Sequence, residues 1–420
     1  MHHVPELNRP SGVRGRPLAP GRAGGSARLG APVALAALGA LGLTLLLAWA
    51  WLGGERQPGV AEGAGRSTTL ERRLERDRGA LRARIAELEA SGNHDRLVAR
   101  VGAMRAGPEL LDGFVDLEGW AVGRHELKYV HEINRPPPAR PKGPIMALDF
   151  GRENHPLHVI TRYARQLRER GIDLLVVPVP NRVQLWADRL PGGGTDLSGA
   201  SGASGASGGA GDLGSARLLL ALCEAGVEVV DLTPVFAAER ARSADGPEGR
   251  TFREHNPHWS PRGVVVCADV LAERIRAMDW FEPGPARAGE DFSVQHERRA
   301  HVFHEQGAGA GAPPTYSFEC VLDAAGSPVD PRDRQSPILV IGDSFTAIYR
   351  PEGADIASQL YARLGLRMDC ISIASGGANT VWKTLARRRD DLAGKRLVVW
   401  IFRMSEFQNL DFQSVPIFSD

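Results

Sequence analysis

The sequence lacks an excess of charge of either sign. Its 420 residues include 51 lysines and arginines against 50 acidic residues, which leaves a formal net charge of +1. Proteins that bind nucleic acid usually carry a strong basic excess that attracts the phosphate backbone. We therefore expect no nucleic-acid partner.

Cysteines and metal-binding patterns are also scarce. The chain has no CxxC or zinc-type spacing, and its four cysteines are Cys223, Cys267, Cys320 and Cys370. Apolar neighbours around three of them predict small core residues, and nothing in the sequence indicates a disulfide. The histidines of QHERRAHVFHE (295–305) lack ligand spacing on a defined element, and GGGT and GAGAG lack the Lys-Ser/Thr of a phosphate loop. We expect neither a metal nor a cofactor.

One long hydrophobic run stands out, APVALAALGALGLTLLLAWAWL at residues 31–52. As a helix it would measure about 33 Å, enough to cross a hydrocarbon core of about 30 Å. The basic segment 1–30 before it predicts a cytoplasmic tail. We expect an uncleaved single-pass anchor in the inner (cell) membrane, with the rest of the chain in the periplasm or otherwise outside the cytoplasm. The alternative is a signal peptide cleaved near Ala48-Trp49-Ala50.

Residues 53–107 are expected to form a linker and a helical stalk. A Gly-rich spacer is followed by a highly charged segment with one apolar stripe, formed by Leu70, Leu74, Leu81, Ile85 and Leu88. Such a stripe is typical of a short coiled coil and predicts a homodimer through the stalk. The alternative is a helix that packs on its own domain.

From residue 108 to residue 420, helical segments alternate with continuous apolar strands. This alternation predicts an α/β domain with a doubly wound, mostly parallel sheet. The strands are expected at 173–179, 227–232, 338–342, 368–374 and 395–402.

Two stretches interrupt this domain. Residues 192–214 are almost entirely Gly, Ser and Ala, and they have too little apolar content to offset the entropy of ordering, so they predict a disordered surface insertion. Residues 283–336 are expected to be irregular and to cover part of the site.

The segment ILVIGDSFTAIYR (338–350) ends a strand with Gly342, Asp343 and Ser344. A hydroxyl at that turn would stand at the carboxyl edge of the sheet, where open α/β folds bind ligands. Ser344 is either a nucleophile or a helix cap. A nucleophile needs a base, and the best candidate is His258 in REHNPHWSPRG (253–263), which could instead cap a helix or be structural.

Five segments together resemble the SGNH-hydrolase-like domain of the alginate O-acetyltransferase family. They are GWAVGRHELKYV (119–130), VVPVPNRVQLWADRL (176–190), HWSPRG (258–263), IGDSF (341–345) and RLVVWIF (396–402). The resemblance, which covers roughly residues 110–410, implies that Ser344 is the nucleophile and His258 the general base.

One position departs from the family pattern Asp-x-His-Trp. Here Asn256, Pro257, His258 and Trp259 occupy it, so a neutral amide replaces the orienting carboxylate. In the serine-protease triad, the same Asp-to-Asn change lowers turnover about 10⁴-fold, in part through the wrong tautomer. Glu254 and Asp231 are the two carboxylates that could compensate.

An acyl transfer also needs donors for the developing oxyanion and contacts for the substrate. The residues that we assign to these roles are Asp343, Gly376, Gly377, Asn379, Arg403 and Trp259. Arg403, just past a strand, could bind an anionic sugar or form a salt bridge. Gly376, Gly377 and Asn379 could equally form an ordinary strand-to-helix turn.

The resemblance implies an extracytoplasmic O-acetyltransferase that moves an acetyl group to hydroxyls of an exopolysaccharide. A multi-spanning membrane acyltransferase would supply the acetyl group. Two alternatives stay open. One is a carbohydrate acetyl esterase with the same residues, and the other is a non-catalytic polysaccharide-binding or scaffold protein in which Asn256 marks lost catalysis.

Overall fold

The computed structural model describes a large part of the predicted stalk and α/β domain. The described residues are 64–106, 114–117, 120–134, 154–187, 190, 211–243, 250–253, 256–300, 315–374, 376–408, 412 and 414–418. The predicted tail and anchor, at 1–30 and 31–52, lie outside them. Among the helices described here, none combines the length and the apolar character needed to cross a membrane.

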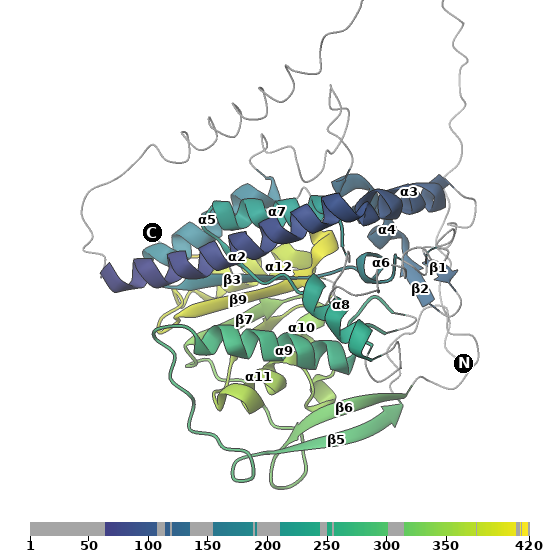
Figure 1. Ribbon diagram of the computed structural model, residues 1–420. Coiled ribbons are helices and arrows are strands. Elements are labelled where there is room, and N and C mark those ends of the chain that lie inside the picture. The colour runs from purple at the N-terminus through teal and green to yellow at the C-terminus, as the bar shows by residue number, and fades with distance from the viewer. Residues whose placement is uncertain are drawn as a thin grey trace, which may run out of the picture. The chain divides into compact units, whose positions relative to one another are not determined.

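A five-stranded parallel sheet forms the centre of the domain (Figure 1). The strand order is β4-β3-β9-β7-β8, so β9, the last strand in the sequence, lies in the middle. The strands are β3 (Asp173–Val179), β4 (Glu228–Val229), β7 (Ile338–Gly342), β8 (Asp369–Ser372) and β9 (Leu397–Arg403). Because helices cover both faces, nearly every residue of β3, β7 and β9 is buried, as the continuous apolar runs predicted.

The helices lie on both faces of this sheet, as expected for a doubly wound fold. In Figure 1, α5 (Pro156–Glu169), α7 (Leu213–Glu224) and α12 (Gly377–Arg388) lie on one side of the sheet. The other side carries α9 (Pro261–Arg276) and α11 (Ile356–Leu364). The other helical elements of the domain are α4 (Arg124–Ile133), α6 (Arg182–Leu185), α8 (Thr233–Arg242), α10 (Ser344–Ala347), η5 (Arg350–Glu352) and η6 (Met404–Gln408).

The predicted stalk is two helices, α2 (Ala64–Ser91) and α3 (Asn93–Ala106), separated by Gly92 in the left-handed conformation with φ of +63°. The apolar stripe of α2 faces its own domain. Leu74, Leu81 and Leu88 are buried, and α2 packs along α7 and the end of β4. The stripe that would form a dimer seam is therefore used within the chain, as in the alternative interpretation of this segment.

Two antiparallel hairpins stand outside the main sheet. One pairs β1 (Phe114–Leu117) with β2 (Trp120–Gly123), and the other pairs β5 (Ser293–Ala300) with β6 (Thr315–Leu322). The second hairpin corrects the expectation of an irregular 283–336. Likewise, α7 begins inside the predicted insertion, because Asp212 caps it by accepting a 2.8 Å bond from the Ser215 amide.

Candidate active site

Ser344 stands at the carboxyl edge of the central sheet. The turn before it requires glycine, because a Cβ on Gly342 would lie only 2.3 Å from the carbonyl oxygen of Ile401 in β9. Asp343 then caps α10, and its carboxylate accepts a 2.9 Å bond from the Phe345 amide. Ser344 is thus held at the first position of a short helix, directly beyond the strand.

The loop that carries His258 is fixed by its backbone. A bridge joins Phe252 to Trp259, and the amide of Arg253 donates a 3.1 Å bond to the carbonyl oxygen of His258. The Trp259 ring is fully buried and meets the Phe345 ring edge-on at 5.5 Å. Trp259, which we assigned to substrate contact, therefore packs in the core and anchors this loop.

Serine, histidine and asparagine form a connected row. Ser344 Oγ lies 2.7 Å from His258 Nε2, and His258 Nδ1 lies 2.5 Å from Asn256 Oδ1. The same Oδ1 accepts a 3.0 Å bond from the backbone amide of His258. Because that amide can only donate, the oxygen of Asn256 must face the ring. His258 then carries its proton on Nδ1, and Nε2 can accept the proton of Ser344.

The row therefore has a competent tautomer but no carboxylate. Burial lowers the pKa of His258 to about 3, and the positive charges of Arg403, Arg253 and Arg182 act in the same direction. His258 is consequently neutral at any ordinary pH, and its protonated form is strongly disfavoured.

Asp343 does not supply the missing charge. Burial raises its pKa to about 6, against the effect of the bond from the Phe345 amide. Its side chain is almost fully buried, and it serves the α10 cap. The oxyanion or substrate role that we assigned to Asp343 has no support from these contacts.

Arg403, the last residue of β9, is held by two side chains. Its Nη2 donates a 2.7 Å bond to Glu406 Oε1, and its Nη1 lies 3.1 Å from His125 Nε2. Since a guanidinium has no acceptor, His125 must accept through Nε2 and is neutral. The salt bridge expected as one alternative is thus present, while 32% of the Arg403 side chain stays exposed.

The predicted second donors lie at the start of α12. Gly377 has a φ of +58°, and a Cβ there would lie 2.8 Å from Glu406 Oε2. The amide of Ala378 points to the same oxygen at 3.4 Å. A carboxylate of the chain itself therefore accepts from this helix start, where we expected Gly376, Gly377 and Asn379 to serve an oxyanion.

Of the two carboxylates that could compensate, the structure describes Asp231. Glu254 lies outside the described residues. Asp231 forms an ion pair with Arg84 of α2 and accepts a 3.0 Å bond from the Thr233 amide. Asp231 is therefore engaged in the contact between α2 and the sheet.

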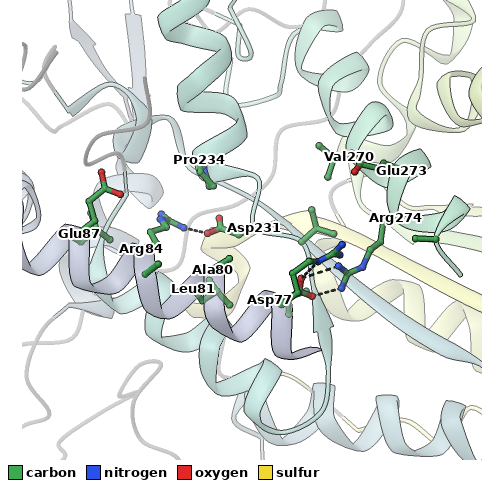
Figure 2. A pocket seen from close by; sticks show the side chains of 16 residues that line it. Asp77, Ala80, Leu81, Arg84, Glu87, Asp231, Pro234, Val270, Glu273 and Arg274 are labelled. Atoms are coloured by element: carbon green, nitrogen blue, oxygen red, sulfur yellow. Dashed lines mark hydrogen bonds and ion pairs between the residues drawn. The ribbon is translucent and has the colours of Figure 1, made fainter. Parts of the chain in front are cut away.

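That contact borders a pocket of about 500 Å³ between α2, the end of β4 and α9 (Figure 2). Asp231 lines it, but none of the residues that we assigned to catalysis or substrate binding does. Figure 2 shows Arg84 directed at Asp231 and Arg274 directed at Asp77. Two arginines that line the pocket are thus paired with carboxylates that also line it.

In the described ranges, no three His, Cys, Asp or Glu side chains are grouped so that they could hold a metal ion. The four cysteines all lie within these ranges and are unbridged. Burial raises the pKa of the Cys223 thiol to about 12, as expected for an inert core residue.

Sequence reasoning missed several ionisable residues that act on His258 or contact Arg403 and Arg182. They are His125, Glu126, Arg182, Arg253 and Glu406. The available signal was their position, because His125 and Glu126 stand in GWAVGRHELKYV and Arg182 stands in VVPVPNRVQLWADRL. These motifs supported the resemblance, but no individual residue in them received a role.

Comparison with models of known protein families gives a match. The family model of the SGNH hydrolase-like domain, acetyltransferase AlgX, matches residues 146–404, more than half of the chain. The matched span contains Asn256, His258, Ser344 and Arg403. No curated protein sequence matches the chain.

Three solved structures are similar at low identity. The O-acetyltransferase domain of Pseudomonas putida AlgJ is 17% identical with a TM-score of 0.45, covering 70% of this chain and 92% of that one. Pseudomonas aeruginosa AlgX is 16% identical with a TM-score of 0.41, covering 59% and 56%. Bacillus cereus PatB1 with a sulfonyl adduct is 10% identical with a TM-score of 0.39, covering 70% and 94%.

Proposed function

Because this chain belongs to the AlgX family of SGNH-hydrolase-like acetyltransferase domains, we propose that it transfers acetyl groups to hydroxyls of an exopolysaccharide through an ester on Ser344. The observation that carries the proposal is the 2.7 Å contact between Ser344 Oγ and His258 Nε2, with Asn256 behind the ring. A nucleophile, a base and an orienting group in this order are what acyl transfer requires.

In the first half-reaction, Ser344 Oγ attacks the acetyl carbonyl of the donor and its proton passes to His258 Nε2. The bond between the acetyl group and the donor then breaks, and the departing group takes that proton. Acetyl-serine and neutral His258 remain.

In the second half-reaction, a sugar hydroxyl attacks the acetyl-serine. His258 accepts the hydroxyl proton and returns it to Ser344 Oγ as the serine ester breaks. The product is an acetylated sugar, and both residues regain their starting protonation states.

The arginines around His258 act on these steps in opposite directions. Their positive charge disfavours the imidazolium, but it favours the negative charge that develops on the acetyl oxygen. A neutral Asn256 leaves the imidazolium without the stabilisation that a carboxylate supplies. We therefore expect a working site with a slow proton transfer.

The setting of the reaction is also part of the proposal. We infer a single-pass anchor at 31–52 that holds the domain outside the cytoplasm, near a multi-spanning membrane acyltransferase that supplies the acetyl group. The apolar run and its basic flank support the anchor, and the family resemblance supports the partner. Arg403, which is partly exposed beside the site, suits an acceptor with an anionic group.

A second candidate is a non-catalytic polysaccharide-binding or scaffold protein. Asn256 and the pKa of about 3 at His258 favour it, because both weaken the base. An acetyl esterase would use the same two half-reactions with water in place of the sugar.

These candidates can be separated with the full chain purified in mild detergent. The protein is incubated with a chromogenic acetyl ester and then analysed by intact mass, beside the variants Ser344→Ala and Asn256→Asp. We expect an acetyl adduct that Ser344→Ala abolishes and that added oligosaccharide, more than water, removes. An inert wild type beside an active Asn256→Asp would overturn the transferase and support the scaffold.

A further inference from the structure

Two motifs whose residues had no assigned role contact each other near the loop that carries His258, called the histidine loop below. They are GWAVGRHELKYV and VVPVPNRVQLWADRL. Glu126 from α4 and Arg182 from α6 are almost fully buried, with 2% and 1% exposure. Arg182 Nη2 lies 3.0 Å from Glu126 Oε2, and the Arg182 amide donates to the other carboxylate oxygen at 3.0 Å. The Gly123 amide adds a third donor at 3.0 Å. The carboxylate is thus fixed from three directions and aligns the guanidinium.

The guanidinium also reaches the loop that carries the base. Arg182 Nη1 donates a 3.2 Å bond to the carbonyl oxygen of Arg253. The amide of Arg253 in turn donates to the carbonyl oxygen of His258 at 3.1 Å. A continuous row of hydrogen bonds therefore runs from Glu126 through Arg182 and Arg253 to the backbone of His258.

We infer that Arg182, aligned by Glu126, is a positioning residue for the reaction: it fixes the backbone of Arg253 and thereby sets the place of His258 against Ser344. This inference rests on the proposed function, because it gives His258 the role of the base. It also explains why the segments GWAVGRHELKYV and VVPVPNRVQLWADRL carry charged residues at buried positions.

Stability alone gives a weaker explanation of this pair. A buried ion pair is often no more stabilising than apolar residues of the same volume. Positioning, in contrast, needs the fork of a guanidinium, since one nitrogen must bind the carboxylate while another binds a carbonyl. A lysine would offer only a compact ammonium group on a flexible stem, without the planar fork of a guanidinium.

The charges that act on His258 come from several elements. Arg182 of α6, Arg253 of the histidine loop and Arg403 of β9 are positive and lower its pKa. The acids nearest to this set are Glu126, which pairs with Arg182, Glu406, which pairs with Arg403, and Asp343 at the start of α10. Changes at Arg182 and Glu126 should therefore shift the pKa of His258 in opposite directions.

The test measures the activation of Ser344 without needing the natural donor. The full chain in detergent is treated with phenylmethylsulfonyl fluoride, which adds a sulfonyl group to an activated serine and releases fluoride. Intact mass follows the rate. We expect Arg182→Met to slow labelling roughly 10²-fold, as for a displacement of a reacting group by about 1 Å. Arg182→Lys should fall between Arg182→Met and wild type.

A double variant separates positioning from loss of stability. Glu126→Gln with Arg182→Met removes both charges, so its melting temperature should recover toward wild type compared with the single variants. Labelling should stay slow, because nothing holds the Arg253 carbonyl. Recovery of labelling together with stability would overturn the inference.

The matched control is Arg274→Met, which breaks another buried Arg–carboxylate contact, at α2. It should lower the melting temperature and leave the labelling rate unchanged. A loss of labelling in Arg274→Met equal to that in Arg182→Met would show that any destabilisation slows the reaction, and it would also overturn the inference.

The pH profile of labelling provides a readout that a purely structural role would not change. Arg182→Met removes a positive charge, so the acid limb should move to higher pH, whereas Glu126→Gln should move it to lower pH. Shifts in one common direction would contradict positioning through Arg182. Absence of labelling in wild type would overturn the proposed function itself, and this inference with it.

Discussion

Two clusters of arginines in this protein differ in the groups that lie beside them. At the α2 seam, formed by Arg73, Asp77, Glu228 and Arg274, each guanidinium binds a carboxylate on another element. Arg73 Nε and Arg274 Nη2 both lie 2.8 Å from Glu228 Oε1. Around His258, Arg182 and Arg403 also pair with carboxylates, but together with Arg253 they place positive charge beside a neutral histidine.

Burial has opposite effects on the titrating groups of the two clusters. At the seam it raises the pKa of Asp77 to about 7 and also raises that of Glu228. At the site it lowers the pKa of His258 to about 3. Both shifts disfavour a charged form in a dry environment. At the seam, ion pairs between arginines and carboxylates offset this effect and hold α2 on the domain. At the site, the His258 ring contacts the neutral Asn256 and lies beside positive charges.

The largest expected effect comes from adding the missing carboxylate. Asn256→Asp places a negative charge 2.5 Å from the His258 ring. The ring then has a carboxylate partner, as the arginines of the seam do. The rate of serine acylation should rise, by at most about 10⁴-fold, the factor known for the reverse change in serine proteases. Stopped-flow measurement with a chromogenic acetyl ester checks this. An unchanged rate would mean that the imidazolium charge does not limit the reaction.

A large effect on stability is expected at the seam. Arg274→Met leaves Asp77 and Glu228 with fewer partners, and breaking such a buried contact should cost about 3–5 kcal/mol of unfolding free energy. Urea unfolding followed by circular dichroism measures it. A loss below about 1 kcal/mol would indicate that the seam is as weak as exposed ion pairs.

The pH dependence should be unusual at the site. A histidine with its ordinary pKa of 6.5 loses its function as a base below that pH, whereas His258, with a pKa of about 3, should not. Labelling of Ser344 should stay constant as the pH falls through 6.5 and should decline only toward pH 3. Over the same range the unfolded chain binds the proton first, so acid should reduce the contribution of His258 to stability. An acid limb at pH 6.5 would contradict the shielding of this residue.

The smallest effect is expected on the exposed side of α2. Arg217 and Glu89 join α7 to α2 at 2.8 Å, but both side chains are about half exposed. Arg217→Ala should change the unfolding free energy by less than about 1 kcal/mol. Calorimetry at low and high salt checks this result, and a larger loss would show that the α2 contact depends on surface charge.

Much of the sheet could be predicted from periodicity. Continuous apolar runs placed all five strands, because parallel strands covered on both sides need apolar residues throughout. The turn at Gly342 and the loop at His258 were likewise visible, since short polar motifs between apolar segments stand out. Their 2.7 Å contact required only that both loops reach the same edge.

The electrostatic surroundings could not be predicted in the same way. Glu126 and Arg182 are separated by 56 positions, and only the folded chain shows that they meet. The leucine stripe of α2 had two equivalent uses, in a dimer or on its own domain. In the folded chain the stripe packs on its own domain, where Arg73 and Arg274 have partners on distant elements.

The central place of β9 has a consequence for biosynthesis. Its position between β3 and β7 means that neither of these strands gains its main neighbour until residues 397–403 have left the ribosome. Until then the chain exposes two apolar strand edges, which are prone to wrong pairing. Premature termination before residue 397 should therefore yield an aggregating product and no partly folded soluble domain.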